Sequence, residues 1–398
     1  MAFLDHAATT PIRPESLVAL TVAYEHTGNA SSLHAAGRQA RKTVEEARES
    51  VAASLGCGPS EVIFTSGGTE SDNLAVKGLY WARRAEARGR VRVLCSAVEH
   101  HAVLDPVAWL GSHEEAVVEH IPVDRLGRID VDALAHMIAL DPGSVALVSV
   151  MMANNEVGTV QPIAEVVRLA HAHGIPVHSD GVQAVGSLDV DFRLSGLDAL
   201  TVSSHKVGGP HGAGALVVGR GVSIEPLLHG GAQERLRSGT LDSPGIAGFA
   251  AALAAAVDGH AEAAHRLTSL RNELVAGVLE LVPDVVVSGD PDSAGRLPGH
   301  AHFSFPGCEG DALLMLLDAR GIECSTGSAC TAGIPEPSHV LLAMGVDPEL
   351  ARGSLRFSLG HTSTPNDVRT VLNELTPVVE RARRAGRPRI RPVSDAVR

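Results

Sequence analysis

Amines that form Schiff bases come from lysine side chains, and this chain contains only three lysines: Lys42, Lys77 and Lys206. Lys42 and Lys77 fall within amphipathic helix patterns, where a solvated amine is expected. Lys206 instead follows the strand-like run DALTVSS and precedes the glycine-rich stretch VGGPHGAG. Burial in a cleft at the end of a strand lowers the pKa of an amine and makes it nucleophilic. We therefore select Lys206 as the candidate nucleophile, with an ordinary surface lysine as the alternative.

A carboxylate occupies a similar position on another predicted strand. Asp180 ends the run IPVHSD, and Gln183 follows three residues later. A carboxylate at the buried end of a strand usually has a cationic partner, and the protonated ring nitrogen of pyridoxal phosphate is one candidate. The alternative is that Asp180 caps the helix that follows.

A glycine-rich turn supplies a candidate phosphate site. Gly67, Gly68 and Thr69 separate the strand-like run EVIFTS from the helical pattern ESDNLAVKGLY. Backbone N–H groups at the start of a helix, with a hydroxyl beside them, bind phosphate groups. The spacing matches neither G-x-x-x-x-G-K-[ST] nor G-x-G-x-x-G, so sites for nucleoside triphosphates and dinucleotides are not indicated.

Three more side chains have types suited to catalysis. His100 follows the run VRVLCSAV and is suited to stacking on an aromatic cofactor or moving protons. Cys330 stands among small residues in STGSAC, where an accessible thiol can attack soft electrophiles. Arg356, in SLRFSLG, has the forked guanidinium that binds carboxylates. The respective alternatives are a structural histidine, a buried inert thiol and a peripheral ion pair.

The elements that position these residues alternate between strand and helix. Six short apolar runs are each followed by a polar or glycine-rich loop and then, in most cases, by a helical pattern. This alternation predicts an α/β fold with a mostly parallel sheet. The runs are EVIFTS, VRVLCS, SVALVSV, IPVHSD, ALTVSS and GALVVG. In such sheets ligands bind beyond the carboxyl ends of the strands. Lysine, aspartate, phosphate turn and arginine in these places are the components of a fold-type I pyridoxal-phosphate enzyme.

The pattern changes after about residue 255, and we predict three regions. Residues 14–254 form a large cofactor-binding domain, whereas residues 1–13 and 255–380 form a smaller α+β domain that carries the Cys330 loop. Residues 381–398, with seven arginines and one acid, form a basic tail that is expected to be flexible. Docking of this tail on an acidic partner is the alternative. Ser, Thr and Gly between Ile322 and Gly333 favour a mobile lid.

Composition excludes several classes of protein. The formal net charge of −13 argues against a direct nucleic-acid binder. Apolar runs stay well short of the roughly 20 residues that a bilayer-spanning helix needs, so no membrane association is predicted. Five scattered cysteines without a C-x-x-C pair argue against disulfides and a structural zinc site. Together with an N-terminus unlike a secretory signal, they predict a cytoplasmic protein.

Ten segments, in order and spacing, resemble the cysteine desulfurases of the NifS/IscS type, and they cover residues 3 to 361: FLDHAATTP, GNASSLH, FTSGGTESDNLAVKG, VEHHAVL, NNEVG, HSDGVQAVG, SSHKVGGPHGAGAL, RSGT, STGSACTAG and SLRFSLG. The resemblance implies a fold-type I, class V aminotransferase-like enzyme that binds pyridoxal 5′-phosphate. Its large domain would contain a mostly parallel seven-stranded sheet. The loop GSACTAGIPEPSHVL resembles the family members with a long cysteine loop.

The resemblance also implies roles around the cofactor ring. Lys206 would carry the cofactor as a Schiff base and act as the catalytic base. Asp180 would pair with the ring nitrogen, Gln183 would contact the phenolic oxygen, and His100 would stack on the ring and take part in catalysis. Asn155 would orient the cofactor and the substrate.

Phosphate and substrate contacts are implied in the same way. The phosphate would be bound by Gly68, Thr69, Ser203 and His205, together with Thr240 from the second subunit of a homodimer. The substrate carboxylate would be bound by Arg356, with Asn29 assisting. Cys330 would accept the sulfur of L-cysteine as a persulfide, and could also act as a transient iron–sulfur ligand; no other metal site is expected.

The activity implied is conversion of L-cysteine to L-alanine, with sulfur passed to an iron–sulfur scaffold or another acceptor protein. Two enzymatic alternatives use the same scaffold: a selenocysteine lyase, and an aminotransferase or β-lyase. A transaminase has no use for a thiol at position 330. A non-enzymatic sulfur-relay or scaffold protein is the third alternative, and such a protein would not need Lys206.

Overall fold

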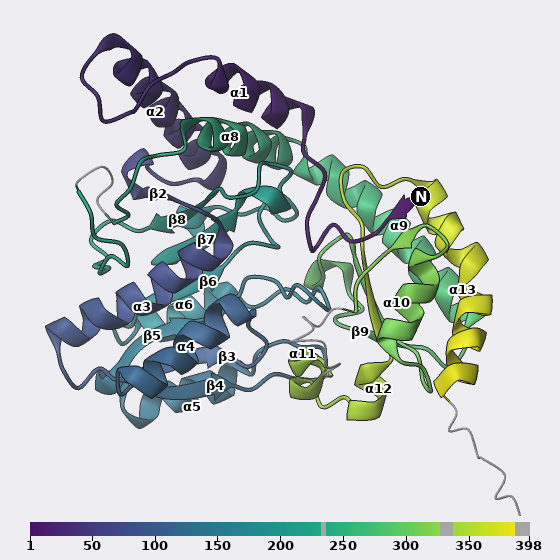
Figure 1. The fold of residues 1–398 in the computed structure, drawn as a ribbon. Coiled ribbons are helices and arrows are strands. Elements are labelled where there is room, and N and C mark those ends of the chain that lie inside the picture. The colour runs from purple at the N-terminus through teal and green to yellow at the C-terminus, as the bar shows by residue number, and fades with distance from the viewer. Residues whose placement is uncertain (232–235, 327–336, 387–398) are drawn as a thin grey trace, which may run out of the picture.

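A seven-stranded sheet forms the centre of the larger part of the molecule (Figure 1). The computed structural model describes residues 1–231, 236–326 and 337–386. The strand order is β2-β8-β7-β6-β5-β3-β4, with β8 antiparallel to both of its neighbours and the other four pairings parallel. The strands are β2 (Val62–Thr65), β3 (Arg92–Ser96), β4 (Val117–Ile121), β5 (Val145–Ser149), β6 (Val177–Asp180), β7 (Ala199–Ser203) and β8 (Gly214–Val218). The predicted α/β fold with a mostly parallel sheet is confirmed.

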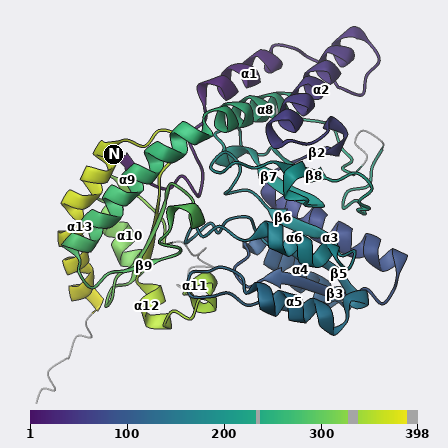
Figure 2. The same cartoon turned by 180° about the vertical axis from the view of Figure 1, so that it is seen from behind.

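Helices cover both faces of this sheet because side chains on each strand alternate between the faces. On β3, Val93 and Cys95 join an apolar cluster with α3 and α4, whereas Leu94 joins a second cluster on the opposite face. Figures 1 and 2 show the two helical layers from opposite sides. The helices of this part are α1 (Pro14–Tyr24), α2 (Ala35–Leu55), α3 (Gly68–Glu86), α4 (His101–His113), α5 (Val131–Leu140), α6 (Ile163–His171), α7 (Phe192–Ser195) and α8 (Ser243–Asp258).

A smaller α+β part follows, built on the antiparallel sheet β12-β10-β9. Its strands are β9 (Val286–Ser288), β10 (His300–Ser304) and β12 (Ser354–Ser358). Its helices are α9 (His260–Leu281), α10 (Gly310–Asp318), α11 (His339–Ala343), α12 (Pro348–Arg352) and α13 (Pro365–Gly386). Apolar residues of α9, α10 and α13 pack with Phe303 of β10 and Phe357 of β12 in one buried cluster.

The first residues of the chain pack against this smaller part (Figure 1). Strand β1 (Ala2–Phe3) pairs in parallel with β11 (Ile322–Glu323), and Asp5 forms a bridge with Ser358 of β12. The segment then crosses toward the larger part, where Thr10 N–H donates to the carbonyl of His205. Residues 5–10 therefore run between the two parts of the molecule.

The end of α13 differs from the sequence prediction. Residues 381–386, which we assigned to a flexible tail, continue the helix. Arg383 explains the extension, since its guanidinium donates to Asp284 Oδ1 at 2.7 Å and to the carbonyl of Pro306 at 3.1 Å. The rest of the tail lies outside the described residues. Across the described ranges, no helix has the length and apolar character needed to cross a bilayer.

Candidate active site

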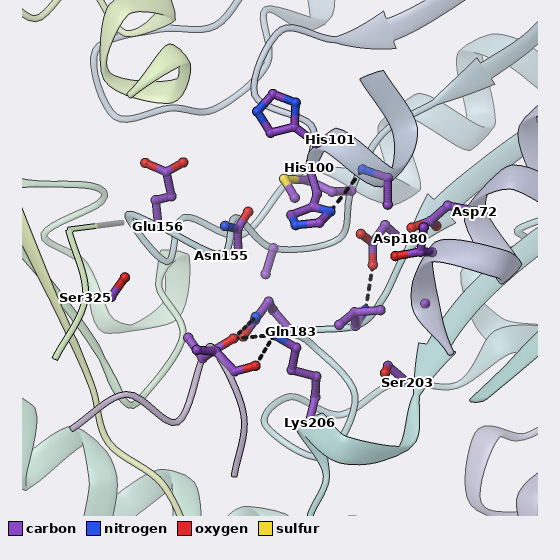
Figure 3. A pocket seen from close by; sticks show the side chains of 18 of the residues that line it. Asp72, His100, His101, Asn155, Glu156, Asp180, Gln183, Ser203, Lys206 and Ser325 are labelled. Carbon is purple, nitrogen blue, oxygen red and sulfur yellow. Dashed lines mark hydrogen bonds between the residues drawn. The ribbon is translucent and has the colours of Figure 1, made fainter. Parts of the chain in front are cut away.

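A cavity of about 470 Å³ opens where the parallel strands end, between the two parts of the molecule. Ten of the residues predicted for the site line it: Gly68, Thr69, His100, Asn155, Asp180, Gln183, Ser203, His205, Lys206 and Arg356. They come from the ends of strands and the turns that follow them, from the start of α3, and from β12. Figure 3 shows many of them around the same space.

Lys206 occupies a turn of 3₁₀ helix, Ser204–Lys206, directly after β7. The turn is tight: a Cβ on Gly209 would lie 2.2 Å from Ser204 Oγ, so only glycine fits there. Lys206 Nζ donates to the carbonyl of Ala8 at 2.9 Å and also to that of Ala7. Burial, followed by the positive charge of Arg356, lowers its pKa to about 8. Lys206 thus has the environment that a nucleophilic amine requires.

Asp180 is the last residue of β6 and is almost fully buried. Its Oδ1 accepts a hydrogen bond from the backbone N–H of Val182 at 2.8 Å. Burial and the nearby carboxyl of Asp72 raise its pKa to about 7. Within the described part of the chain no cation forms an ion pair with Asp180, so this carboxylate is ready to pair with a cationic group in the cavity.

The start of α3 forms a cradle of hydrogen-bond donors. Gly67 precedes the helix with φ of 145°, and no side chain of the described residues caps the first turn. A Cβ on Gly68 would lie 3.0 Å from Val182 Cγ2, so a larger residue at position 68 would crowd the space between the start of α3 and Val182. Ser203 Oγ is buried and has no hydrogen-bond partner among the described residues. Free backbone N–H groups and an unpartnered hydroxyl at one end of the cavity fit an anion such as a phosphate group.

His100 caps the N-terminus of α4 with its ring. Nδ1 accepts from the backbone N–H of Ala102 at 3.1 Å, so the proton of the neutral ring lies on Nε2. Burial and the charge of Lys206 lower the pKa of His100 to about 4, which keeps the ring neutral near pH 7. Figure 3 shows the ring projecting into the cavity between Asn155 and Asp180.

Arg356 lies on β12 and lines the cavity from the smaller part of the molecule. Its Nη2 donates to Asp5 Oδ1 at 2.8 Å and its Nη1 to the carbonyl of Asn155 at 2.9 Å. Its Nε is buried without a partner among the described residues. Gln183 Nε2 donates to the carbonyl of Ala7 at 2.9 Å, which ties the N-terminal segment to the cavity wall. The guanidinium is therefore fixed in place at the cavity wall, where its positive charge suits a carboxylate ligand.

Three predicted residues are not part of this lining. Asn29 is exposed, and its Oδ1 accepts from the backbone N–H of Ser31 at 2.9 Å. Thr240 is also exposed. Cys330 lies outside the described residues, although Ser325 and Pro337, on either side of that gap, both line the cavity.

Sequence reasoning missed a buried carboxyl at the cavity wall. Glu156 follows Asn155 within the NNEVG motif and accepts a hydrogen bond from Ser338 Oγ at the start of α11. Burial raises its pKa to about 7. The sequence offered the motif but not the contact, because Glu156 and Ser338 are 182 positions apart. His101, His339 and Asp72 line the cavity as well and were not predicted.

Replacing Glu156 with glutamine should change the pH dependence of stability. The unfolded chain releases the Glu156 proton at a pKa of about 4.5, whereas the folded protein holds it up to a pKa of about 7. The stability of the wild type therefore falls progressively as the pH rises between these two values. Glutamine does not ionise and still accepts from Ser338. Relative to the wild type, E156Q should therefore gain stability over that range, by roughly 3 kcal/mol at most, and the gain should level off above pH 7.

Thermal unfolding of both proteins between pH 5 and pH 8.5 measures this difference. The matched variant Ser338→Ala removes the hydroxyl partner and keeps the carboxyl, so it should lose stability at every pH. A difference between E156Q and the wild type that does not vary with pH would contradict the raised pKa of Glu156.

Comparisons with known proteins agree with this geometry. The family model "Aminotransferase class-V" matches residues 2–371. An "IscS-like cysteine desulfurase" of Mycobacterium tuberculosis is 58% identical, over 97% of this chain and 98% of that protein. "Cysteine desulfurase NifS" of Azotobacter vinelandii is 42% identical, over 96% of this chain and 93% of that protein.

Solved structures give the same result. A "NifS-like protein" superposes with a TM-score of 0.87 at 37% identity, covering 96% of this chain and 100% of that chain. "SspA in complex with cysteine" superposes with a TM-score of 0.76 at 33% identity, covering 90% of this chain and 99% of that chain. The chain belongs to the class-V aminotransferase family, and within it to the group of IscS/NifS cysteine desulfurases.

Proposed function

We propose that this protein is a pyridoxal-phosphate-dependent cysteine desulfurase, which converts L-cysteine to L-alanine and carries the sulfur away as a persulfide on Cys330. The observation that carries the proposal is the joint placement of Lys206, Asp180 and the donor cradle of α3 around one cavity. An amine of lowered pKa, a buried carboxylate that no described cation pairs with, and an anion site are the three features that bind this cofactor.

The residues present fit pyridoxal phosphate at both of its ends. The unpartnered Ser203 hydroxyl, the free N–H groups of Gly68 and Thr69, and the ring of His205 would hold the phosphate. Asp180 would pair with the ring nitrogen at the other end. Gln183 would contact the phenolic oxygen, and His100 would lie against the ring face. When bound, the cofactor acts as an electron sink that acidifies the substrate Cα–H.

Lys206 and Arg356 would act directly on the substrate. Arg356, fixed by Asp5 and Asn155, offers its guanidinium to the substrate carboxylate. That contact would hold the substrate in the cavity that Lys206 also lines, and the Lys206 amine, neutral in a large fraction of molecules near pH 8, can take the Cα proton.

Cys330 would perform the sulfur transfer. Its thiolate attacks the sulfur of the substrate, so that a bond forms between the two sulfur atoms while the substrate Cβ–S bond breaks. The electron pair of the broken bond stays with Cβ, which takes up a proton. Lys206 would return a proton to Cα, and the carbon skeleton leaves as L-alanine. The sulfur remains on Cys330 until an acceptor thiol removes it.

Product analysis tests the proposal. Purified enzyme with L-cysteine and a thiol reductant should release alanine and sulfide in equal amounts. Pyruvate and ammonia in place of alanine would instead identify a β-lyase, and a reaction restricted to selenocysteine would identify a selenocysteine lyase. No reaction with either amino acid would contradict an enzymatic function at this cavity.

Asp180→Asn should greatly slow the reaction without unfolding the protein. Asparagine keeps the size of the side chain and can still accept from the N–H of Val182, but it carries no negative charge to hold a proton on the cofactor ring nitrogen. Loss of that charge pairing should reduce kcat by about 100-fold or more. Steady-state kinetics of Asp180→Asn measure the loss.

Asp72→Asn is the matched control because it also changes a buried carboxyl of this region. It should retain most of its activity, and equal losses in the two variants would contradict the role given to Asp180.

The proposal extends to the assembly and its surroundings. Thr240 is exposed in this chain, which suits a residue that reaches the phosphate of a second subunit, and Leu17, Val18 and Val22 leave an apolar face of α1 exposed for such a homodimer. The acceptor would be an iron–sulfur scaffold or another sulfur-acceptor protein. The four cysteines that the structure describes are free thiols, and free thiols suit the cytoplasm.

A further inference from the structure

Three side chains from separate segments form a hydrogen-bonded chain beside the cavity. Nδ1 of His205 lies 3.3 Å from Thr9 Oγ1, and the same oxygen lies 3.2 Å from Nε2 of His211. Thr9 belongs to the N-terminal segment, His205 to the 3₁₀ turn after β7, and His211 to the glycine-rich loop. The two imidazole rings also stack, with centroids 5.3 Å apart and planes inclined by 23°.

A threonine hydroxyl has one proton, which restricts how this chain can be arranged. His205 is neutral near pH 7, because burial and then the charge of Lys206 lower its pKa to about 4. In one arrangement Thr9 donates to Nδ1 of His205 and accepts from Nε2–H of His211. In the other, the direction is reversed and Nδ1 of His205 carries the proton.

The two arrangements present different groups to the cavity. His205 lines the cavity, and its Nδ1 is occupied by Thr9, so Nε2 is the ring nitrogen left for a ligand. In the first arrangement Nε2 carries a proton and can donate. In the second it presents a lone pair, which would repel an anion.

The groups that line the cavity with His205 favour the first of the two arrangements. The same cavity is lined by the Ser203 hydroxyl and the N-terminus of α3, which have no partner or side-chain cap among the described residues and are donors suited to an anion. Only a donating Nε2–H of His205 is compatible with an anion in that place. The first arrangement then also requires His211 to supply the terminal N–H.

We propose that Thr9 and His211 are positioning residues that hold His205 as the Nε2–H tautomer, so that its ring donates a hydrogen bond to the phosphate of the cofactor. The proposal rests on the proposed function, since it assumes that pyridoxal phosphate is the ligand. Thr9 fixes the tautomer. His211 orients the hydroxyl of Thr9 and, by stacking, fixes the rotation of the His205 ring.

The stack gives His211 two separable contributions. Its ring covers one face of His205, and its Nε2–H completes the chain through Thr9. Phenylalanine at position 211 keeps an aromatic ring and removes the donor. Glutamine keeps an N–H at the corresponding position and removes the ring. The pair of substitutions therefore separates hydrogen bonding from stacking.

Binding of pyridoxine 5′-phosphate tests the proposal independently of catalysis. This compound carries the phosphate but has no aldehyde, so it cannot bond to Lys206. Its dissociation constant would be measured by calorimetry on the full-length, cofactor-free protein for the wild type and for Thr9→Val, Thr9→Ser, His211→Phe and His211→Gln. Thermal unfolding of each variant shows whether it is folded.

Thr9→Val should weaken binding about tenfold, since loss of one hydrogen bond to a ligand-binding group has roughly that effect. Thr9→Ser, which keeps the hydroxyl, should bind within about twofold of the wild type. His211→Phe should weaken binding about threefold, a smaller effect because water can partly replace an exposed donor, and His211→Gln should bind more tightly than His211→Phe. Binding by a folded Thr9→Val protein as tight as that of the wild type would overturn the proposal, and so would equal losses in Thr9→Val and Thr9→Ser.

Failure of the proposed function would look different. In that case the wild type itself would not bind pyridoxine 5′-phosphate, and borohydride treatment of the protein with pyridoxal phosphate would not modify Lys206. That result would remove both proposals. Binding by the wild type with no effect of Thr9→Val would remove only the role of Thr9 and His211.

Discussion

Replacing Lys206 with arginine should abolish turnover of L-cysteine while leaving the protein folded. Arginine keeps the positive charge and can still donate to the carbonyls of Ala7 and Ala8, which are the contacts of Lys206 in the structure. A guanidinium stays protonated in proteins, however, so it can neither form a Schiff base nor take the Cα proton. We expect kcat to fall by at least ~10⁴-fold, together with loss of the visible absorbance of the bound cofactor.

Steady-state kinetics and the absorption spectrum of Lys206→Arg check this result. Lys77→Arg is the matched control, because Lys77 lies outside the cavity with its amine 4.4 Å from the centre of the Trp109 ring, a contact that arginine can also make. Lys77→Arg should keep full activity. Turnover by Lys206→Arg above a few per cent of the wild-type rate would remove Lys206 from the mechanism.

Cys330→Ala separates sulfur transfer from cofactor binding. Without this thiol, no persulfide can form on the enzyme, and alanine and sulfide production should fall below detection. The cofactor should still bind, because Asp180, Ser203 and Lys206, on β6, on β7 and on the turn after β7, are unchanged by the substitution. The spectrum of the bound cofactor should therefore match that of the wild type.

Cys324→Ala is the control for Cys330→Ala. Cys324 is buried, and burial raises its pKa to about 12, so this thiol is not a nucleophile near pH 7. Its replacement should leave sulfur transfer intact. Persistent conversion of cysteine to alanine by Cys330→Ala would contradict the assignment of Cys330, and loss of transfer in a folded Cys324→Ala would point to the wrong thiol.

Much of the fold was predictable because its strands are buried on both faces. All six apolar runs contain strands of the central sheet, since strands buried on both faces are continuously apolar. The seventh strand, β4, was missed because it is only partly buried and its sequence is partly polar; Val117 and His120 are both exposed. Residues 381–386 were assigned to the tail on charge, whereas Arg383 has a specific partner in Asp284.

The site was predictable wherever a residue ends a strand or lies within three positions after one. Lys206, Asp180 and Gly68 were found by that rule, because the ends of parallel strands meet at one edge of the sheet. Hydrogen bonds between residues far apart in the sequence were not predicted. Glu156 meets Ser338, and Thr9 meets His205 and His211, only after the two parts of the molecule come together.

One measurement tests the central claim most directly. The enzyme is mixed with a single equivalent of L-cysteine and no reductant, and alanine release is followed together with the mass of the peptide that contains Cys330. We predict that one alanine appears for each Cys330 peptide that gains the mass of one sulfur atom, and that borohydride-treated enzyme from the same preparation carries the reduced cofactor on Lys206. Alanine release without added sulfur on Cys330, or a cofactor attached elsewhere than Lys206, would contradict the account.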